Sequence, residues 1–186
     1  MHMNANLTSS LLAMLCAGSP VVCANPAQSI QVPVAVSQRS HAALSTQVFD
    51  AVNAYRHSVG ATELQRHAGL DRLAQQHCEY LRQHRGTFTL RGKNVSHIGF
   101  EGRAMYARAY YQMDNISENA AAVEHAGANP GPTLVTLWKA SKDHQHAMVD
   151  SWTHSGLGLV VDSDGMLFAV QLFATVNPSL IRNNRF

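Results

Sequence analysis

The feature that most limits how this chain can fold is an apolar segment near its C-terminus, residues 166–176. Both sets of alternating positions in this segment are largely apolar. It follows an Asp-Ser-Asp-Gly turn signal at 162–165, which is preceded by another apolar stretch at 157–161, so the two stretches are expected to form a hairpin. A strand that is apolar on both faces is normally covered on both faces. We therefore expect an α+β fold, an α-β-α sandwich with a small antiparallel sheet between helical layers.

Helical spacing of apolar residues predicts the elements that would form these layers. The first helix is expected to begin at Ser45, a favourable N-cap, and to end at Gly60. A second helix is expected over residues 70–85, with His77 and Cys78 on its apolar face. We interpret this histidine as a hydrogen-bonded core residue rather than a ligand. Further helices are expected over residues 103–111 and 133–140, and a short, partly extended segment over residues 115–123.

The N-terminal residues resemble a leader for export. The first Lys or Arg is Arg39, no Asp or Glu precedes it, and residues 7–17 form an apolar run of the length found in signal peptides. This run is too short to span a bilayer as a helix. Small residues at 22–24 are suited to signal peptidase, so residues 1–24 are predicted to be a signal peptide of a secreted or periplasmic protein. An uncleaved N-terminal anchor is the alternative.

Removal of the leader would leave a chain with three parts. Residues 25–44, rich in Pro, Ala, Ser, Gln and Val, are expected to be a linker, residues 45–177 the folded domain and residues 178–186 a C-terminal tail. No transmembrane span is expected in this mature chain. Two of the three cysteines lie in the leader, so Cys78 would have no intramolecular disulfide partner. We expect it to be a small buried residue rather than a reactive thiol.

The amino-acid composition limits both the class of protein and its partners. Hydrophobic residues make up 46% of the chain and charged residues 14%, which excludes an intrinsically disordered protein. The formal charge is only +2 and there is no Lys/Arg run, so nucleic acid is not an expected partner. The 11 histidines are a surplus of a residue that binds metals and titrates near neutral pH.

Three segments contain residues suited to chemistry. His97 precedes a glycine-containing loop, Glu118 lies in a Ser-Glu-Asn-Ala sequence, and His144 follows Trp138 by six residues. They are 21 and 26 residues apart (118 − 97 = 21 and 144 − 118 = 26), so only the fold could bring them together. No Gly-x-Ser-x-Gly elbow or other nucleophile motif is present.

The order and context of these segments resemble the CAP superfamily (the cysteine-rich secretory, antigen five and pathogenesis-related proteins, also called SCP domains), most of all its bacterial, disulfide-poor branch. The similarity extends from about Val48 to Ala174, with every landmark in order. The similar segments are residues 52–56 of the first helix, Ser96-His97 through Arg103, residues 117–121, Trp138 through His144, residues 155–158 and residues 170–173.

This resemblance implies an α-β-α sandwich with a surface cleft that holds His97, Glu118 and His144. In some relatives two histidines bind a divalent metal, often zinc, so His97 and His144 would be the metal ligands here and Glu118 a catalytic general base. His154 would be an auxiliary group. The sequence departs from the family pattern at Ser117, where the family has Gly.

Two functions follow from the resemblance. The first is a monomeric binding module for a small apolar ligand or a protein partner, whose cleft can also bind Zn²⁺ or another divalent cation. The second is a zinc-dependent, peptidase-like hydrolase that uses His97 and His144 as ligands and Glu118 as general base. A third, simpler possibility is a structural protein of the cell envelope. We rank binding above hydrolysis.

Overall fold

The computed structural model describes residues 34–86 and 96–177 of the chain. The predicted signal peptide, the first part of the predicted linker and the predicted C-terminal tail lie outside these residues. The described residues form five helices and four strands. In chain order these are α1 (Val34–Ser58), β1 (Gln65–Arg66), α2 (Ala68–Gln83), α3 (Phe100–Tyr111), β2 (Met113–Val123), α4 (Pro130–Lys139), α5 (Lys142–Val149), β3 (His154–Val161) and β4 (Leu167–Val176).

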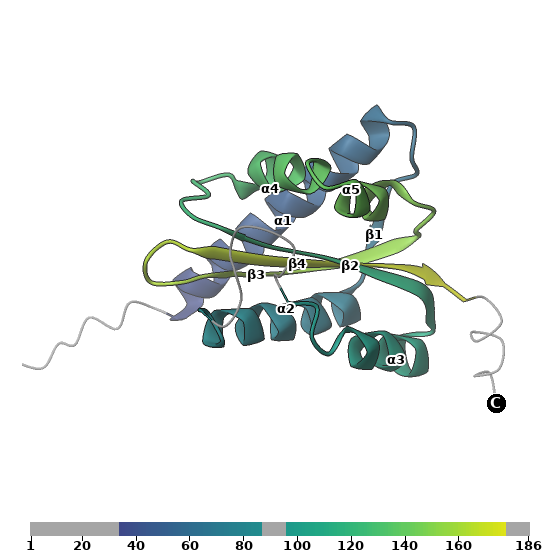
Figure 1. The fold of residues 1–186 in the computed structure, drawn as a ribbon, viewed down its shortest axis with the longest axis horizontal. Coiled ribbons are helices and arrows are strands. Elements are labelled where there is room, and N and C mark those ends of the chain that lie inside the picture. Colours follow the sequence, from purple (N-terminus) through teal and green to yellow (C-terminus); the bar gives the residue numbers. More distant parts are fainter. Residues whose placement is uncertain (1–33, 87–95, 178–186) are drawn as a thin grey trace, which may run out of the picture. The chain divides into compact units, whose positions relative to one another are not determined.

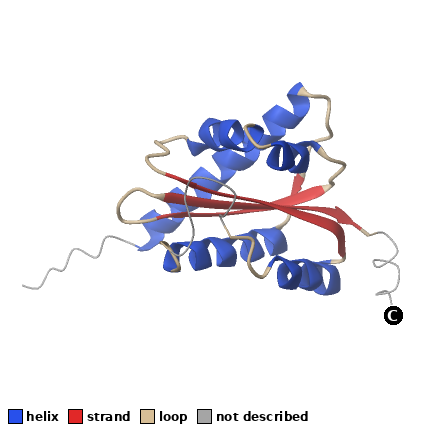
Figure 2. Cartoon of the chain, in the orientation of Figure 1, coloured by secondary structure: helices blue, strands red, loops and turns tan. Residues whose placement is uncertain are grey.

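The four strands form one sheet in the order β1-β3-β4-β2. The three long strands are antiparallel to their neighbours, whereas the two-residue strand β1 runs parallel to β3, so the sheet is mixed. Helices α1, α4 and α5 cover one face and α2 and α3 cover the other (Figures 1 and 2). The predicted α-β-α sandwich is confirmed, and the two-residue strand β1 adds one short parallel pairing to its antiparallel sheet.

Strand β4 is buried on both faces, as its sequence predicts. Leu167, Ala169 and Phe173 belong to a hydrophobic core on the side of α1, α4 and α5. The alternating residues Phe168 and Val170 belong to a second core on the side of α2 and α3. Side chains of a strand point alternately to the two faces, so β4 contributes to both cores at once.

Two glycines let α2 pack directly onto β3. A Cβ atom at Gly156 would lie 2.3 Å from the α2 main chain at Leu70 and Asp71, and one at Gly158 would lie 2.3 Å from the main chain at Ala74. The close approach brings α2 side chains to the edge of β3 beyond the short strand β1. There Asp71 Oδ1 and a glutamine of α2 accept hydrogen bonds from main-chain N–H groups of β3, at 2.8 and 2.9 Å.

Helix α1 begins at Val34, so the prediction that the first helix begins at Ser45 is wrong. Residues 34–44 contain neither Gly nor Pro, and nothing in this segment stops a helix. The same residues were expected to belong to a linker. Ser45 lies inside the helix and is buried, and its hydroxyl donates to the main-chain oxygen of Leu157 in β3.

Other elements differ in extent from the sequence prediction. The helix expected from residue 103 begins at Phe100, the helix expected from 133 begins at Pro130, and the segment expected to be partly extended is the eleven-residue strand β2. Helix α5 and strand β1 were not predicted. The sequence of α5 is mostly polar and buries only Ala147 and Met148, so its periodicity is too weak to indicate a helix.

Helix α2 and its cysteine are as predicted. Cys78 lies in the core on the α2 side with none of its surface exposed, and burial raises the pKa of its thiol well above the ordinary value. It is therefore an apolar core residue and not a reactive thiol. No helix among the described residues has the length and apolarity needed to cross a bilayer.

Candidate functional site

The candidate site is built on β2, which is the edge strand of the sheet in the described part of the chain. Neighbouring residues of this strand point to opposite faces. Glu118 points toward α2 and α3, and its side chain is only 1% exposed. Asn119 points toward α5, where its Nδ2 atom donates to the main-chain oxygen of His144 at 3.0 Å. The strand thus connects the two helical layers at its free edge.

Both carboxylate oxygens of Glu118 accept hydrogen bonds. Arg103 of α3 donates from Nε to Oε2 and from Nη2 to Oε1, each at 2.8 Å. The Nδ1 atom of His97 lies 2.9 Å from Oε1. A buried carboxylate requires such partners, because an unpaired charge away from water is costly. Glu118 is therefore the centre of a network that joins β2 to α3 and to the segment before it.

His97 lies just before α3, and its imidazole reaches the surface with 43% of the side chain exposed. Since its Nδ1 faces a carboxylate, this nitrogen donates and Nε2 carries the free lone pair when the ring is neutral. Arg103 also holds the backbone of this segment, because its Nη1 donates to the main-chain oxygen of Ile98 at 2.9 Å. Arg103 thus fixes both the carboxylate and the histidine that contacts it.

His77 of α2 lies beneath this network. Its Nε2 is 2.7 Å from the main-chain oxygen of Ser96 and 3.8 Å from Oε1 of Glu118. Burial lowers the pKa of His77, an effect that the negative charge of Glu118 partly opposes. The prediction of a hydrogen-bonded core histidine is confirmed, and the residue supports the segment that carries His97.

His144 reaches the same place from α5, on the other side of the sheet. Its ring centre lies 6.4 Å from that of His97. Burial, and then the neighbouring His97, lower the pKa of His144, whereas Asp143 acts in the opposite direction. The structure thus brings together His97, Glu118 and His144, which are far apart in the sequence.

A groove of about 770 Å³ runs from these residues along β2. Six consecutive residues of the strand, 117–122, line one side of it. Because side chains of a strand alternate between faces, an unbroken run can line one groove only if the groove follows the main-chain edge. The other side is formed by residues of α4, α5 and the turn between them, namely Leu137, Trp138, Ala140, Ser141, Asp143, His144 and Ala147.

The family profile described as CAP, the cysteine-rich secretory protein family, matches residues 49–173. The chain belongs to the CAP family. The match contains β1, β2, β3, most of β4 and all the residues of the Glu118 network. A comparison with curated protein sequences gives no significant match.

Solved structures support the fold. An outer surface protein of Borrelia burgdorferi is 18% identical with a TM-score of 0.57, over 73% of this chain and 94% of that one. An extracellular SCP-domain protein of Bacillus anthracis is 19% identical with a TM-score of 0.57, over 77% of this chain and 44% of that one. A cysteine-rich secretory protein of Staphylococcus aureus is 17% identical with a TM-score of 0.52, over 76% and 40%. The CAP domain thus spans less than half of the last two chains.

The structure does not bring His154 to the groove of this CAP domain. His154 begins β3, and its ring lies 6.0 Å from that of His67 at the start of α2. Two residues that the sequence reasoning did not assign to the site do belong to it, Arg103 and Asn119. The only signal in the sequence was their position inside segments that resemble the family, next to Gly102 and Glu118.

The donor set of the CAP domain fits an open two-histidine metal site and not a larger one. Within residues 34–86 and 96–177, no group of three or more His, Cys, Asp or Glu side chains is placed to share a cation. Glu118 is bound by Arg103 and His97, so it is not free to act as a third ligand. A metal here would be held by His97 and His144 and would remain accessible to water.

Proposed function

We propose that this CAP domain is an exported binding module whose groove along β2 takes an extended polypeptide segment. The observation that carries the proposal is the run of residues 117–122 along one wall of the groove. Export is inferred from the predicted leader and supported by the descriptions of two similar proteins as outer-surface and extracellular.

The main chain of β2 supports a polypeptide as the ligand. Within the described residues, β2 pairs only with β4, so its other edge offers main-chain N–H and C=O groups to the groove. An extended peptide satisfies such groups by adding a strand to the sheet, and pockets for alternate side chains then provide specificity. A lipid has no repeated donors and acceptors at this spacing, so it would leave these groups unpaired.

The wall opposite β2 is suited to apolar side chains of a peptide. Leu137 of α4 is 43% exposed at the groove, and three of the six β2 residues that line it, 120–122, are alanines. Small side chains leave room for an added strand between β2 and the α4–α5 layer. His97 and His144 at one end would contribute polar contacts and limit how far the peptide extends.

The experiment starts from a displayed library of linear peptides selected on the whole chain, with affinities measured by fluorescence anisotropy. Each selected peptide is then N-methylated at one position at a time. Strand addition predicts a loss of affinity at every second position, because alternate N–H groups of an added strand face β2. Equal sensitivity at all positions, or at none, would contradict this mode of binding.

Leu137→Glu in the groove and Met105→Glu on α3 form a matched pair of variants. Both positions are exposed, at 43% and 68%, and only Leu137 lines the groove. Leu137→Glu is expected to weaken peptide binding at least tenfold, whereas Met105→Glu leaves it unchanged. Equal binding by the two variants would place the peptide elsewhere on the molecule.

We also propose that His97 and His144 bind a divalent cation such as Zn²⁺. This is favoured by the free Nε2 of His97 and by the 6.4 Å between the two ring centres, a separation that a small side-chain rotation would adapt to a shared ion. When bound, zinc polarises a carbonyl group or activates a water molecule.

Calorimetric titration of zinc should show binding that is lost in His97→Ala and in His144→Ala but kept in His57→Ala, an exposed position on α1. Binding that persists in either of the first two would remove that residue from the site.

A zinc-dependent hydrolase is the weaker proposal. It would require Glu118 to accept a proton from water, but both of its oxygens already accept from Arg103 and His97 and its side chain is buried. A general base must lie within hydrogen-bonding reach of the proton that it removes. The proposal would be supported by zinc-dependent peptide cleavage that is lost in Glu118→Gln.

A further inference from the structure

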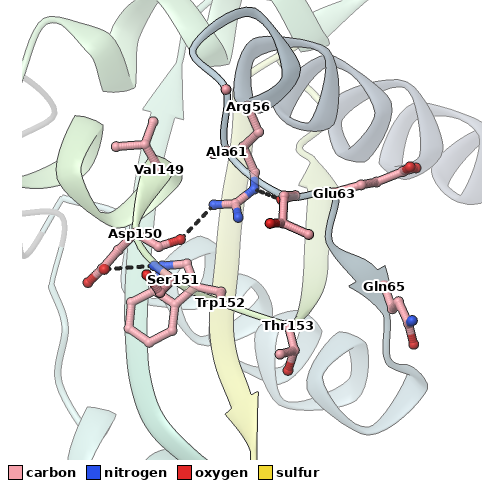
Figure 3. Close-up of a pocket in the computed structure, with 11 residues that line it drawn as sticks. Arg56, Ala61, Glu63, Gln65, Val149, Asp150, Ser151, Trp152 and Thr153 are labelled. Carbon is pink, nitrogen blue, oxygen red and sulfur yellow. Dashed lines mark hydrogen bonds between the residues drawn. The ribbon is translucent and has the colours of Figure 1, made fainter.

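A second cavity, of about 480 Å³, lies apart from the groove, at the ends of α1 and α5 (Figure 3). Arg56, in the last turn of α1, is at its base. Ser151, Trp152 and Thr153, which follow α5, form one side, and residues 60–63 together with Gln65 form the other. None of these residues lines the groove along β2.

Arg56 is 1% exposed and its guanidinium is bonded to three main-chain oxygens. Nε donates to Thr62 at 2.7 Å, and Nη1 donates to Met148 at 2.7 Å and to Asp150 at 3.0 Å. Among the described residues, no group accepts from Nη2. Figure 3 shows this nitrogen pointing into the space between Ser151 and Gln65. Two N–H donors of a buried cation therefore face the cavity.

No carboxylate of the described residues is bonded to this guanidinium. The carboxylate of Asp150 is turned toward the main-chain nitrogen of Ser151, to which it is bonded at 2.7 Å, and Glu63 extends away from Arg56 (Figure 3). Burial lowers the pKa of Arg56, and the charge of Asp150 only partly opposes this. A buried charge without a counter-ion is costly, so an anion in the cavity would stabilise it.

We propose that this cavity binds a carboxylate group through Nη2 of Arg56. The hydroxyl of Ser151 has no partner among the described residues and lines the same cavity, so it can donate to the second oxygen. Val149 and the ring of Trp152 offer an apolar surface to the rest of the ligand, and the indole N–H of Trp152 is held by the main-chain oxygen of Ala147 at 2.7 Å.

The charges around the cavity favour a carboxylate over a phosphate. Arg56 is the only arginine among the described residues that lines the cavity, and the acidic residues Asp150 and Glu63 also line it. A single negative charge is neutralised by Arg56, whereas a second one would be repelled by these two residues.

The test is a nuclear magnetic resonance titration of the full chain with sodium acetate, at constant ionic strength maintained with sodium chloride. The Nε–H signal of Arg56 and the main-chain N–H signal of Ser151 are expected to shift in a saturable way, with a dissociation constant in the millimolar range. Parallel titration with inorganic phosphate should give weaker binding than acetate. Equal shifts in chloride alone, or tighter binding of phosphate, would overturn the proposal.

Ser151→Glu and Ser163→Glu are matched variants for this titration. Both serines are exposed, and Ser163 lies in the turn at the opposite end of β3. Glutamate at 151 places a tethered carboxylate beside Nη2 and leaves the three bonds of Arg56 in place, so acetate binding should weaken at least tenfold. The Ser163→Glu variant should bind acetate as the unmodified chain does. Undiminished binding by Ser151→Glu would show that acetate does not occupy the cavity.

Discussion

At the scale of single residues, the site depends on the hydrogen bonds that hold the buried side chain of Glu118. Arg103 supplies two of the hydrogen bonds to its carboxylate and His97 supplies the third. The side chain of Arg103 is 12% exposed, so the pair is close to the surface but largely out of water. Charge-assisted hydrogen bonds in such a position are worth more than those of an exposed ion pair.

Glu118→Gln is expected to lower the free energy of unfolding by about 2 kcal/mol. The amide of glutamine has one oxygen and one NH₂ group, so at least one N–H of Arg103 would face another donor. The estimate is below the cost for a completely buried pair, because Arg103 can reach water. Urea denaturation measures the effect, with Glu124→Gln, an exposed position just after β2, as the control. Equal stability of the two variants would show that the network contributes nothing to the fold.

Acid is expected to destabilise the protein through two histidines, the buried His77 and the half-buried His144. Burial lowers the pKa of His77 and His144 below the ordinary value of 6.5. As the pH falls through 6.5, the unfolded chain therefore takes up protons that the folded chain does not, and the free energy of unfolding decreases. Denaturation in urea between pH 8 and about pH 5 measures this slope.

His77→Gln should reduce this dependence on pH. The slope of stability against pH below 6.5 should be smaller in this variant than in the unmodified chain, even if the variant is less stable at every pH. A slope in His77→Gln as steep as in the unmodified chain would mean that other groups cause the acid sensitivity.

At the scale of the elements, the contact between α2 and β3 decides how closely one helical layer lies on the sheet. Gly158→Ala is expected to lower the free energy of unfolding by about 2–3 kcal/mol, because the added methyl group would lie 2.3 Å from the main chain of α2. Thermal unfolding monitored by circular dichroism measures the effect.

Gly102→Ala is the matched control for this contact. Gly102 lies in α3, and a Cβ atom there would meet no atom within 4 Å. Alanine is favoured over glycine in a helix, so this variant should be about 0.5–1 kcal/mol more stable than the unmodified chain. If Gly158→Ala were as stable as Gly102→Ala, the close approach of α2 to β3 would not depend on the missing side chain at residue 158.

The elements also show which parts of the fold the sequence can predict. Strand β4 and helix α2 were predicted because their apolar residues follow a clear period and are buried as that period requires. Helix α5 was not, since most of its surface is polar and its place is set by contacts with α4 and β2. The residues of the site were found through family resemblance, whereas Arg103 was missed because its role comes from a distant partner on β2.

At the scale of the whole molecule, two hydrophobic cores share one sheet. The core containing Leu134 lies under α1, α4 and α5, and the core containing Leu70 lies under α2 and α3. Both cores include side chains of β3 and β4. Because neither core exists without these strands, we expect the described domain to unfold in a single cooperative transition.

The two cores can be tested separately with Leu134→Ala and Leu70→Ala. Both leucines are completely buried, and each variant should lose about 3 kcal/mol of stability. Trp138 and Trp152 both pack in the core under α1, α4 and α5, so tryptophan fluorescence reports on that core alone.

Cooperative unfolding predicts that Leu70→Ala, in the opposite core, shifts the fluorescence transition as far as the transition in far-ultraviolet circular dichroism. If the fluorescence transition stayed in place while the circular dichroism transition moved, α2 and α3 would unfold on their own. The helical layer that carries Arg103 and His77 could then open without the layer that carries His144, and the candidate site would be dismantled before the protein unfolds.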